Sequence, residues 1–106
     1  MANKINPERL KSTLASLKAR FEAGTIESMK DLTGMYVTGL ITALGMGYDG
    51  FVSKCNSPEK FVMEDIIKLA NLTDVEINLI LKVILRQGIK NVKKRDISHL
   101  LNLSKD

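Results

Sequence analysis

The chain has 106 residues, 44% of them hydrophobic and 26% charged, and a formal net charge of +4, which fits one domain with its own core and excludes a disordered tail. One cysteine, Cys55, and one histidine, His99, exclude disulfide frameworks, Cys/His zinc sites and Cys–His nucleophile pairs within one chain, so we expect no enzyme activity, no metal and no cofactor. No apolar stretch approaches the roughly 18 residues of a membrane span and no secretion signal opens the chain, so we expect a cytoplasmic protein without a membrane partner.

The first expected element is a helix that begins near Asn6 and ends at Gly24. Asn6-Pro7-Glu8 combines a capping side chain, a proline suited to the first helical position and an acid in the first turn. Four apolar residues then recur at helical spacing, namely Leu10, Leu14, Leu17 and Phe21. Residues 1–25 are therefore expected to form an amphipathic helix that either docks on the chain's own core or pairs two subunits of a homodimer.

The next two segments differ in how clearly they predict structure. Residues 25–35 are expected to be helical, because Ile26, Met29 and Leu32 are spaced for one face. Residues 36–44 are ambiguous, because their β-branched and aromatic side chains favour a strand, whereas Leu40 and Leu44 fit a helical face.

A glycine-rich stretch follows, Gly45-Met46-Gly47-Tyr48-Asp49-Gly50, and it matches the G-x-G-x-x-G pattern of dinucleotide-binding proteins. That function needs a doubly wound sheet, but everything after residue 60 has helical periodicity. The other interpretation is a helix-turn-helix, with helices at Val37–Leu44 and Tyr48–Cys55. Gly45 suits the turn, because glycine reaches left-handed backbone angles without strain.

Three further helices are expected downstream, so the fold class is all-α: a compact bundle of about six or seven short helices with a central helix-turn-helix. One helix begins at Met63. Thr73-Asp74-Val75-Glu76 is expected to be a capping box that starts the next, which Gly88 would stop. Asp96 is expected to cap a last short helix, whose apolar residues are Ile97, Leu100, Leu101 and Leu103.

Residues 40–53, together with 61–70 and 74–76, resemble the helix-turn-helix and the following helices of phage repressor and Cro-type regulators, often called the XRE family. The resemblance covers roughly residues 26–86 and implies a DNA-binding domain whose third helix enters the major groove, usually as a homodimer. Two positions depart from the family pattern: Ile41 is bulkier than expected, and Lys54 stands where an aliphatic core residue is usual.

The resemblance implies DNA contacts along the second and third helices. The expected DNA-binding residues are Thr38, Gly47, Tyr48, Asp49, Ser53, Lys54 and Asn56. The apolar spacing agrees about the face, because it leaves Asp49, Ser53 and Lys54 outward and Tyr48 half-buried. Lys54 could donate to guanine and Asn56 to an adenine edge. Asp49 also suits the first turn of a helix, where a carboxylate is favourable without any DNA.

The basic charge is concentrated at the two ends: residues 1–26 carry +3 and residues 86–106 carry +4, whereas residues 27–85 carry −3. A basic C-terminal extension over residues 89–106 would thus follow a DNA-binding domain over residues 26–88. The expected phosphate-contacting residues are Arg86, Lys90, Lys93, Lys94 and Arg95. These charges could equally be solvated.

Two functions follow from this pattern. The first is a DNA-binding transcriptional regulator without catalysis, with double-stranded DNA and a second copy of the chain as partners. The alternative is a helical protein-interaction module or antitoxin-like partner, which the acidic centre and the lack of arginine in the expected recognition helix favour.

Overall fold

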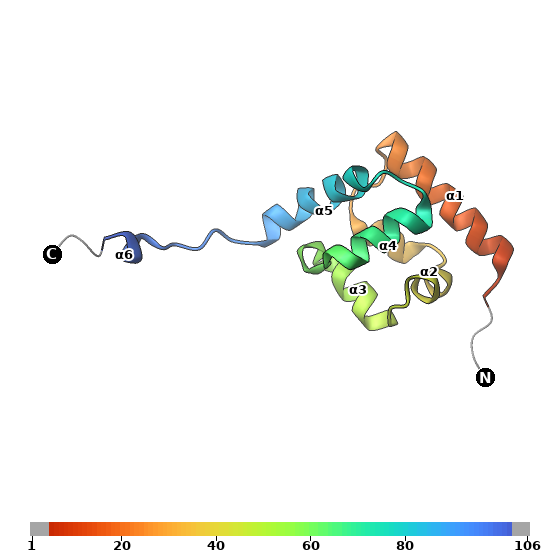
Figure 1. Cartoon of the computed structure of the whole chain (residues 1–106), viewed down its shortest axis with the longest axis horizontal. Helices are drawn as coiled ribbons and strands as arrows, with labels where there is room; N and C mark the ends of the chain where they lie inside the picture. The colour runs from red at the N-terminus through yellow and green to blue at the C-terminus, as the bar shows by residue number, and fades with distance from the viewer. Residues whose placement is uncertain (1–4, 103–106) are drawn as a thin grey trace.

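Residues 5–102 are the part of the chain that the structure, a computed structural model, describes, and every regular element among them is helical. This confirms the expected compact all-α fold, and residues 37–44 of the ambiguous segment are a helix. The elements, with η denoting a 3-10 helix, are α1 (Pro7–Ala23), η1 (Met29–Gly34), α2 (Val37–Leu44), α3 (Tyr48–Asn56), η2 (Pro58–Lys60), α4 (Met63–Thr73), α5 (Ile77–Asn91) and α6 (Ser98–Leu101) (Figure 1).

Helix α1 has the ends that the sequence predicts. The Asn6 side chain accepts a hydrogen bond from the Arg9 amide at 3.1 Å, and Gly24 closes the helix with φ 75°. Leu17 and Phe21 are buried in the core of their own chain, and Leu14 packs against it. Helix α1 contacts α4 and α5, so its apolar seam docks on its own domain.

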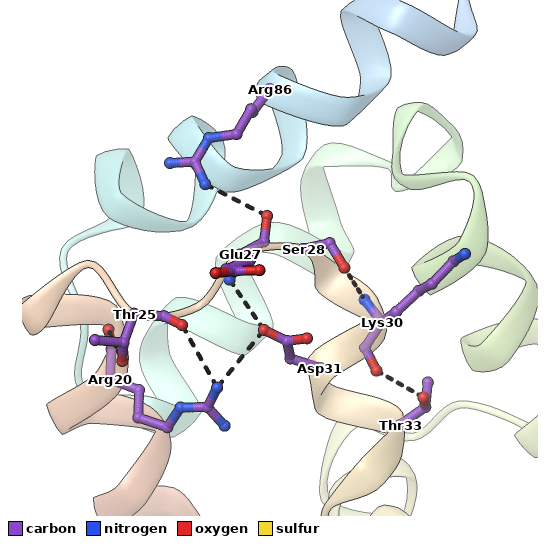
Figure 2. A network of polar contacts seen from close by, with 8 residues as sticks. All are labelled: Arg20, Thr25, Glu27, Ser28, Lys30, Asp31, Thr33 and Arg86. Atoms are coloured by element: carbon purple, nitrogen blue, oxygen red, sulfur yellow. Dashed lines mark hydrogen bonds and ion pairs between the residues drawn. The ribbon is translucent and has the colours of Figure 1, made fainter.

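The predicted helix at residues 25–35 is only partly correct, because the segment forms the short helix η1. Its polar side chains bond to nearby backbone and so compete with regular helical bonds. The Ser28 hydroxyl accepts from the Lys30 amide at 3.3 Å, and the Asp31 carboxylate accepts from the Glu27 amide at 2.9 Å (Figure 2).

Two predicted helix boundaries near α5 are wrong. Thr73 does not cap α5; it ends α4, where its buried hydroxyl donates to the Leu69 carbonyl at 2.8 Å, and Asp74 then turns the chain with φ 56°. Gly88 does not stop α5, which runs on to Asn91. Gly88 is buried inside the helix where η2 packs on α5, and a Cβ there would make an ordinary contact with Glu59 at 3.4 Å.

The core fills the space between the helices of residues 7–91, and α4 contacts α1, α2 and α5 (Figure 1). The largest side chains that are almost completely shielded from solvent come from helices α1 to α5, from η1 and η2, and from one loop: Leu17, Ile26, Met29, Leu32, Leu40, Phe51, Cys55, Pro58, Leu69 and Ile80. No helix within residues 5–102 has the length and apolar character needed to cross a membrane.

Beyond α5 the chain leaves the bundle. Residues 92–97 form no helix, and the one-turn helix α6 lies far from the other elements (Figure 1). The predicted last short helix is present, but its N-cap is Ile97 and not Asp96 as predicted. The Asp96 carboxylate still accepts from the Ser98 amide in the first turn, at 2.9 Å. Leu103, predicted to belong to that helix, lies outside the described residues. We call residues 92–102 the arm.

Candidate nucleic-acid interface

Helices α2 and α3 are joined by a tight connection at residues 45–47. Gly45 has φ 72° and ψ 32°, as the turn was expected to require, and the Met46 amide donates to the Ile41 carbonyl at 2.9 Å. Gly47 has an extended backbone and precedes the first residue of α3. The connection therefore depends on left-handed geometry at Gly45, whereas a side chain at Gly47 or Gly50 would meet open space.

Buried side chains fix how α3 is rotated on the domain. Leu40 and Leu44 of α2 pack in the same core as Phe51 and Cys55 of α3. This leaves the opposite face of α3 to solvent, with Asp49, Gly50, Ser53 and Asn56 exposed. A three-residue connection and a shared core thus hold α3 on the surface of the bundle, with its polar side outward.

Tyr48 is exposed to solvent, whereas Thr38 is half-buried. Tyr48 was expected to be half-buried, but 59% of it is exposed, because it occupies the first turn of α3 beyond the reach of the core. Thr38 is half-buried near the start of α2, and its carbonyl accepts a bond from the Thr42 hydroxyl at 2.7 Å. The exposed phenol and the exposed polar residues of α3 thus form one surface, which we call the α3 face: Gly47, Tyr48, Asp49, Gly50, Ser53 and Asn56.

Lys54 does not point outward as predicted. Its ammonium group lies 2.6 Å from a carboxylate oxygen of Asp65 in α4, and the Lys54 and Asp65 side chains are only 27% and 11% exposed. The same Asp65 oxygen accepts from the Val62 amide at 3.2 Å, which fixes the carboxylate at the first turn of α4. Lys54 therefore joins α3 to α4. Its ammonium group would have to give up Asp65 before it could bind a base.

The basic residues of the C-terminal extension have different surroundings. Arg86 donates to the Glu27 carbonyl at 3.3 Å, so it is partly engaged with the domain (Figure 2). Lys90, Lys93, Lys94 and Arg95 are exposed, and none of them forms an ion pair within residues 5–102. These four residues carry the largest uncompensated positive charge in the described part of the chain.

A hydrogen bond links the last residue of α5, just before the arm, to η2. The side-chain amide of Asn91 donates from Nδ2 to the Glu59 carboxylate at 2.9 Å, and this bond is the main cause of the lowered pKa of Glu59. Glu59 lies in η2, which follows α3 after a single residue and packs on α5. The arm therefore leaves the bundle close to the end of the α3 face.

No protein-family model, curated protein or solved structure matches the chain.

Cys55, the single cysteine, lies on the buried side of α3. Burial raises the pKa of the Cys55 thiol to about 12, so it stays protonated at neutral pH and behaves as a packing residue. Within residues 5–102, no three His, Cys, Asp or Glu side chains are grouped so that they could hold a metal ion.

Sequence reasoning missed two residues that position α2 and α3. One is Asp65, whose pairing with Lys54 joins residues eleven apart and has no local signal. The other is Tyr36, whose hydroxyl accepts from the Asn6 amide at 2.9 Å while the Arg9 guanidinium lies 4.4 Å from its ring centre. Its ring also covers Gly39, where a Cβ would lie only 2.7 Å away. Tyr36 thus ties the start of α2 to the start of α1.

Proposed function

We propose that the protein binds double-stranded DNA as a transcriptional regulator, with α2 and α3 acting as a helix-turn-helix. The observation that carries this proposal is the pairing of α3 with α2 through Gly45, which leaves the α3 face polar and exposed. A helix held on the surface in this way has the form of a recognition helix, which enters the major groove and reads base edges. The resemblance of residues 26–86 to repressor and Cro-type regulators supports the same role.

The α3 face has base-reading groups but no free cation. Asn56 has both a donor and an acceptor for an adenine edge, and Ser53 can donate to a base or a phosphate. Asp49 would accept from a cytosine amino group, since it would otherwise repel phosphate. Affinity for the DNA backbone must therefore come from elsewhere on the protein.

The arm supplies that charge. Its residues 92–97, if extended, span about 20 Å, which exceeds the roughly 12 Å width of the major groove. Because the arm leaves the domain beside η2, Lys93, Lys94 and Arg95 would reach phosphates that flank the groove occupied by α3. In this arrangement α3 reads sequence, and the arm with Lys90 provides most of the salt-dependent affinity.

A second candidate function is protein binding without DNA. The ion pair between Lys54 and Asp65 favours it, because it neutralises the only cation of α3. In that case the α3 face would contact a polar protein surface, as the partner of a toxin or another regulator.

A salt titration distinguishes these functions. Binding of the full chain to random duplex DNA is measured by fluorescence anisotropy between about 50 and 200 mM salt. We expect affinity to fall by orders of magnitude. Replacing both Lys93 and Lys94 with alanine should lower the slope of log K against log salt by about 2, whereas the control, Lys11→Ala with Lys82→Ala, should leave it nearly unchanged.

The control lysines are also exposed, but they lie on α1 and in the middle of α5. The absence of any anisotropy change at micromolar protein and low salt would overturn the DNA-binding proposal. An equal loss of slope in both double variants would overturn the role of the arm.

A further inference from the structure

We propose that two copies of the chain associate by exchanging arms, so that α6 of each copy docks in an apolar groove of the other. The groove lies between η2, α4 and the C-terminal half of α5. This association does not depend on the proposed DNA binding.

The groove has a volume of about 330 Å³, and its lining is mainly apolar. Phe61, Ile66 and Ile84 line it, together with Leu85 and Ile89 of α5. Ile89, although it is part of this lining, is 71% exposed. A group of exposed apolar side chains around a concave surface is typical of a protein contact site.

The arm carries a matching set of unpaired apolar side chains. Ile97, Leu100 and Leu101 are exposed, and Leu101 reaches 72%. Ile97 immediately precedes α6, and Leu100 and Leu101 are at its third and fourth positions, so one helical turn presents all three within a short length. Three exposed large apolar residues in an extended arm indicate a segment that is completed by a partner.

The composition of the arm favours a second copy over the chain's own groove. Residues 92–97 contain no glycine or proline, and their one turn-forming residue, Asp96, accepts from the Ser98 amide at the start of α6. Lys93, Lys94 and Arg95 are adjacent like charges, which extend a linker by mutual repulsion. The arm accordingly extends away from the bundle, and α6 lies apart from the helices that line the groove (Figure 1).

The charges agree with a contact between copies. Glu59 lines the groove, and Glu64 lies two residues before Ile66 on α4. The arm brings Lys93, Lys94 and Arg95 just ahead of α6, so docking of α6 would place cations near these carboxylates. Because the groove and the arm belong to the same chain, two copies related by a twofold axis make both contacts at once and leave neither set exposed.

Cysteine cross-linking tests the exchange directly, because the native thiol of Cys55 is buried and unreactive. Ile89→Cys and Leu101→Cys are made in separate chains, mixed and mildly oxidised. We expect a cross-linked dimer in the mixture at a yield well above that of either variant alone. As a control, Ile67→Cys, an exposed position outside the groove lining, should not cross-link to Leu101→Cys.

A single chain that carries both Ile89→Cys and Leu101→Cys tests whether the arm instead docks in the groove of its own chain. Internal closure at high dilution, without dimer in the mixture, would show that the arm folds back on its own groove and would overturn the proposal. Failure of both reactions would overturn it as well.

Sedimentation equilibrium gives an independent measure. We expect the wild type to dimerise reversibly in a concentration-dependent way, and Leu101→Asp to raise the dissociation constant at least about tenfold, as expected when a charge replaces a docked apolar group. Ile67→Asp should leave the constant unchanged. A wild type that remains monomeric at several hundred micromolar, or an equal effect of both variants, would overturn the exchange. Loss of dimerisation together with retained DNA binding would leave the proposed function intact.

Discussion

Gly45 and Gly50 lie five residues apart but have different roles in the backbone. Gly45 has the left-handed conformation that ends α2, whereas Gly50 lies in the first turn of α3 with open space around it. The sequence predicted this difference, because a turn between two helical patterns requires one residue with positive φ. A dinucleotide site would instead need small residues at both Gly47 and Gly50.

Substitution of these two glycines should therefore have opposite effects. Gly45→Val should lower the free energy of unfolding by about 1 kcal/mol or more, because a β-branched residue is forced into a strained conformation. Gly50→Ala should leave it unchanged or raise it by up to about 1 kcal/mol, because alanine is the better helix former. Urea unfolding monitored by circular dichroism measures both. A Gly45→Val protein as stable as the wild type would contradict the role assigned to the turn.

Lys54 illustrates what the sequence could not predict at this scale. The apolar spacing of α3 indicated an outward side chain, whereas the family resemblance has an aliphatic core residue at this position. The Asp65 carboxylate holds Lys54 against α4. The pairing depends on how α4 packs beside α3, and this is decided by the whole core. Local spacing carries no information about that packing.

Removal of the Lys54–Asp65 ion pair should lower the stability of the folded protein. We expect Lys54→Ala to lower the free energy of unfolding by roughly 1 to 3 kcal/mol, because it leaves the poorly exposed Asp65 carboxylate without its cation. Lys68→Ala, which breaks the exposed pair with Glu64, should cost at most about 0.5 kcal/mol. A double-mutant cycle with Asp65→Asn measures the coupling. A Lys54→Ala protein that melts like the wild type would show that the pair contributes nothing.

At the scale of the elements, most of the helices could be predicted but several of their ends could not. Asn6, Gly24 and Gly45 act through their own backbone or capping chemistry, so their effects were visible in the sequence. Thr73 and Gly88 have equally strong local signals, but tertiary packing overrides them. Thr73 is buried at the end of α4, and Gly88 is buried inside α5 where η2 packs on it.

Helix α1 gives a test of docking against pairing. Leu17 is completely buried, so Leu17→Ala should lower the free energy of unfolding by about 2 to 5 kcal/mol through lost burial and the cavity left behind. Ala15 lies on the exposed side of the same helix, and Ala15→Ser should change the free energy of unfolding by less than about 0.5 kcal/mol. Thermal melts at two protein concentrations provide the measurement. A destabilisation by Leu17→Ala that appears only at high concentration would assign the seam to subunit pairing.

At the scale of the whole molecule, the two basic ends differ in a way that net charge did not reveal. In the N-terminal part, Lys18 pairs with Glu22 and lies near Asp74, and Arg20 pairs with Asp31 (Figure 2). Their charge is therefore used within the domain. The cations of the arm form no ion pair among the described residues, so more of the positive charge is left uncompensated at the C-terminal end.

The arm also changes how the protein behaves as a particle in solution. The Cα radius of gyration is 17.5 Å, against about 13 Å for an ordinary domain of this length. A single copy should therefore elute from a sizing column as early as a larger globular protein. A column calibrated with globular proteins would therefore give one copy an apparent mass close to that of a dimer, whereas light scattering or sedimentation would give its true mass.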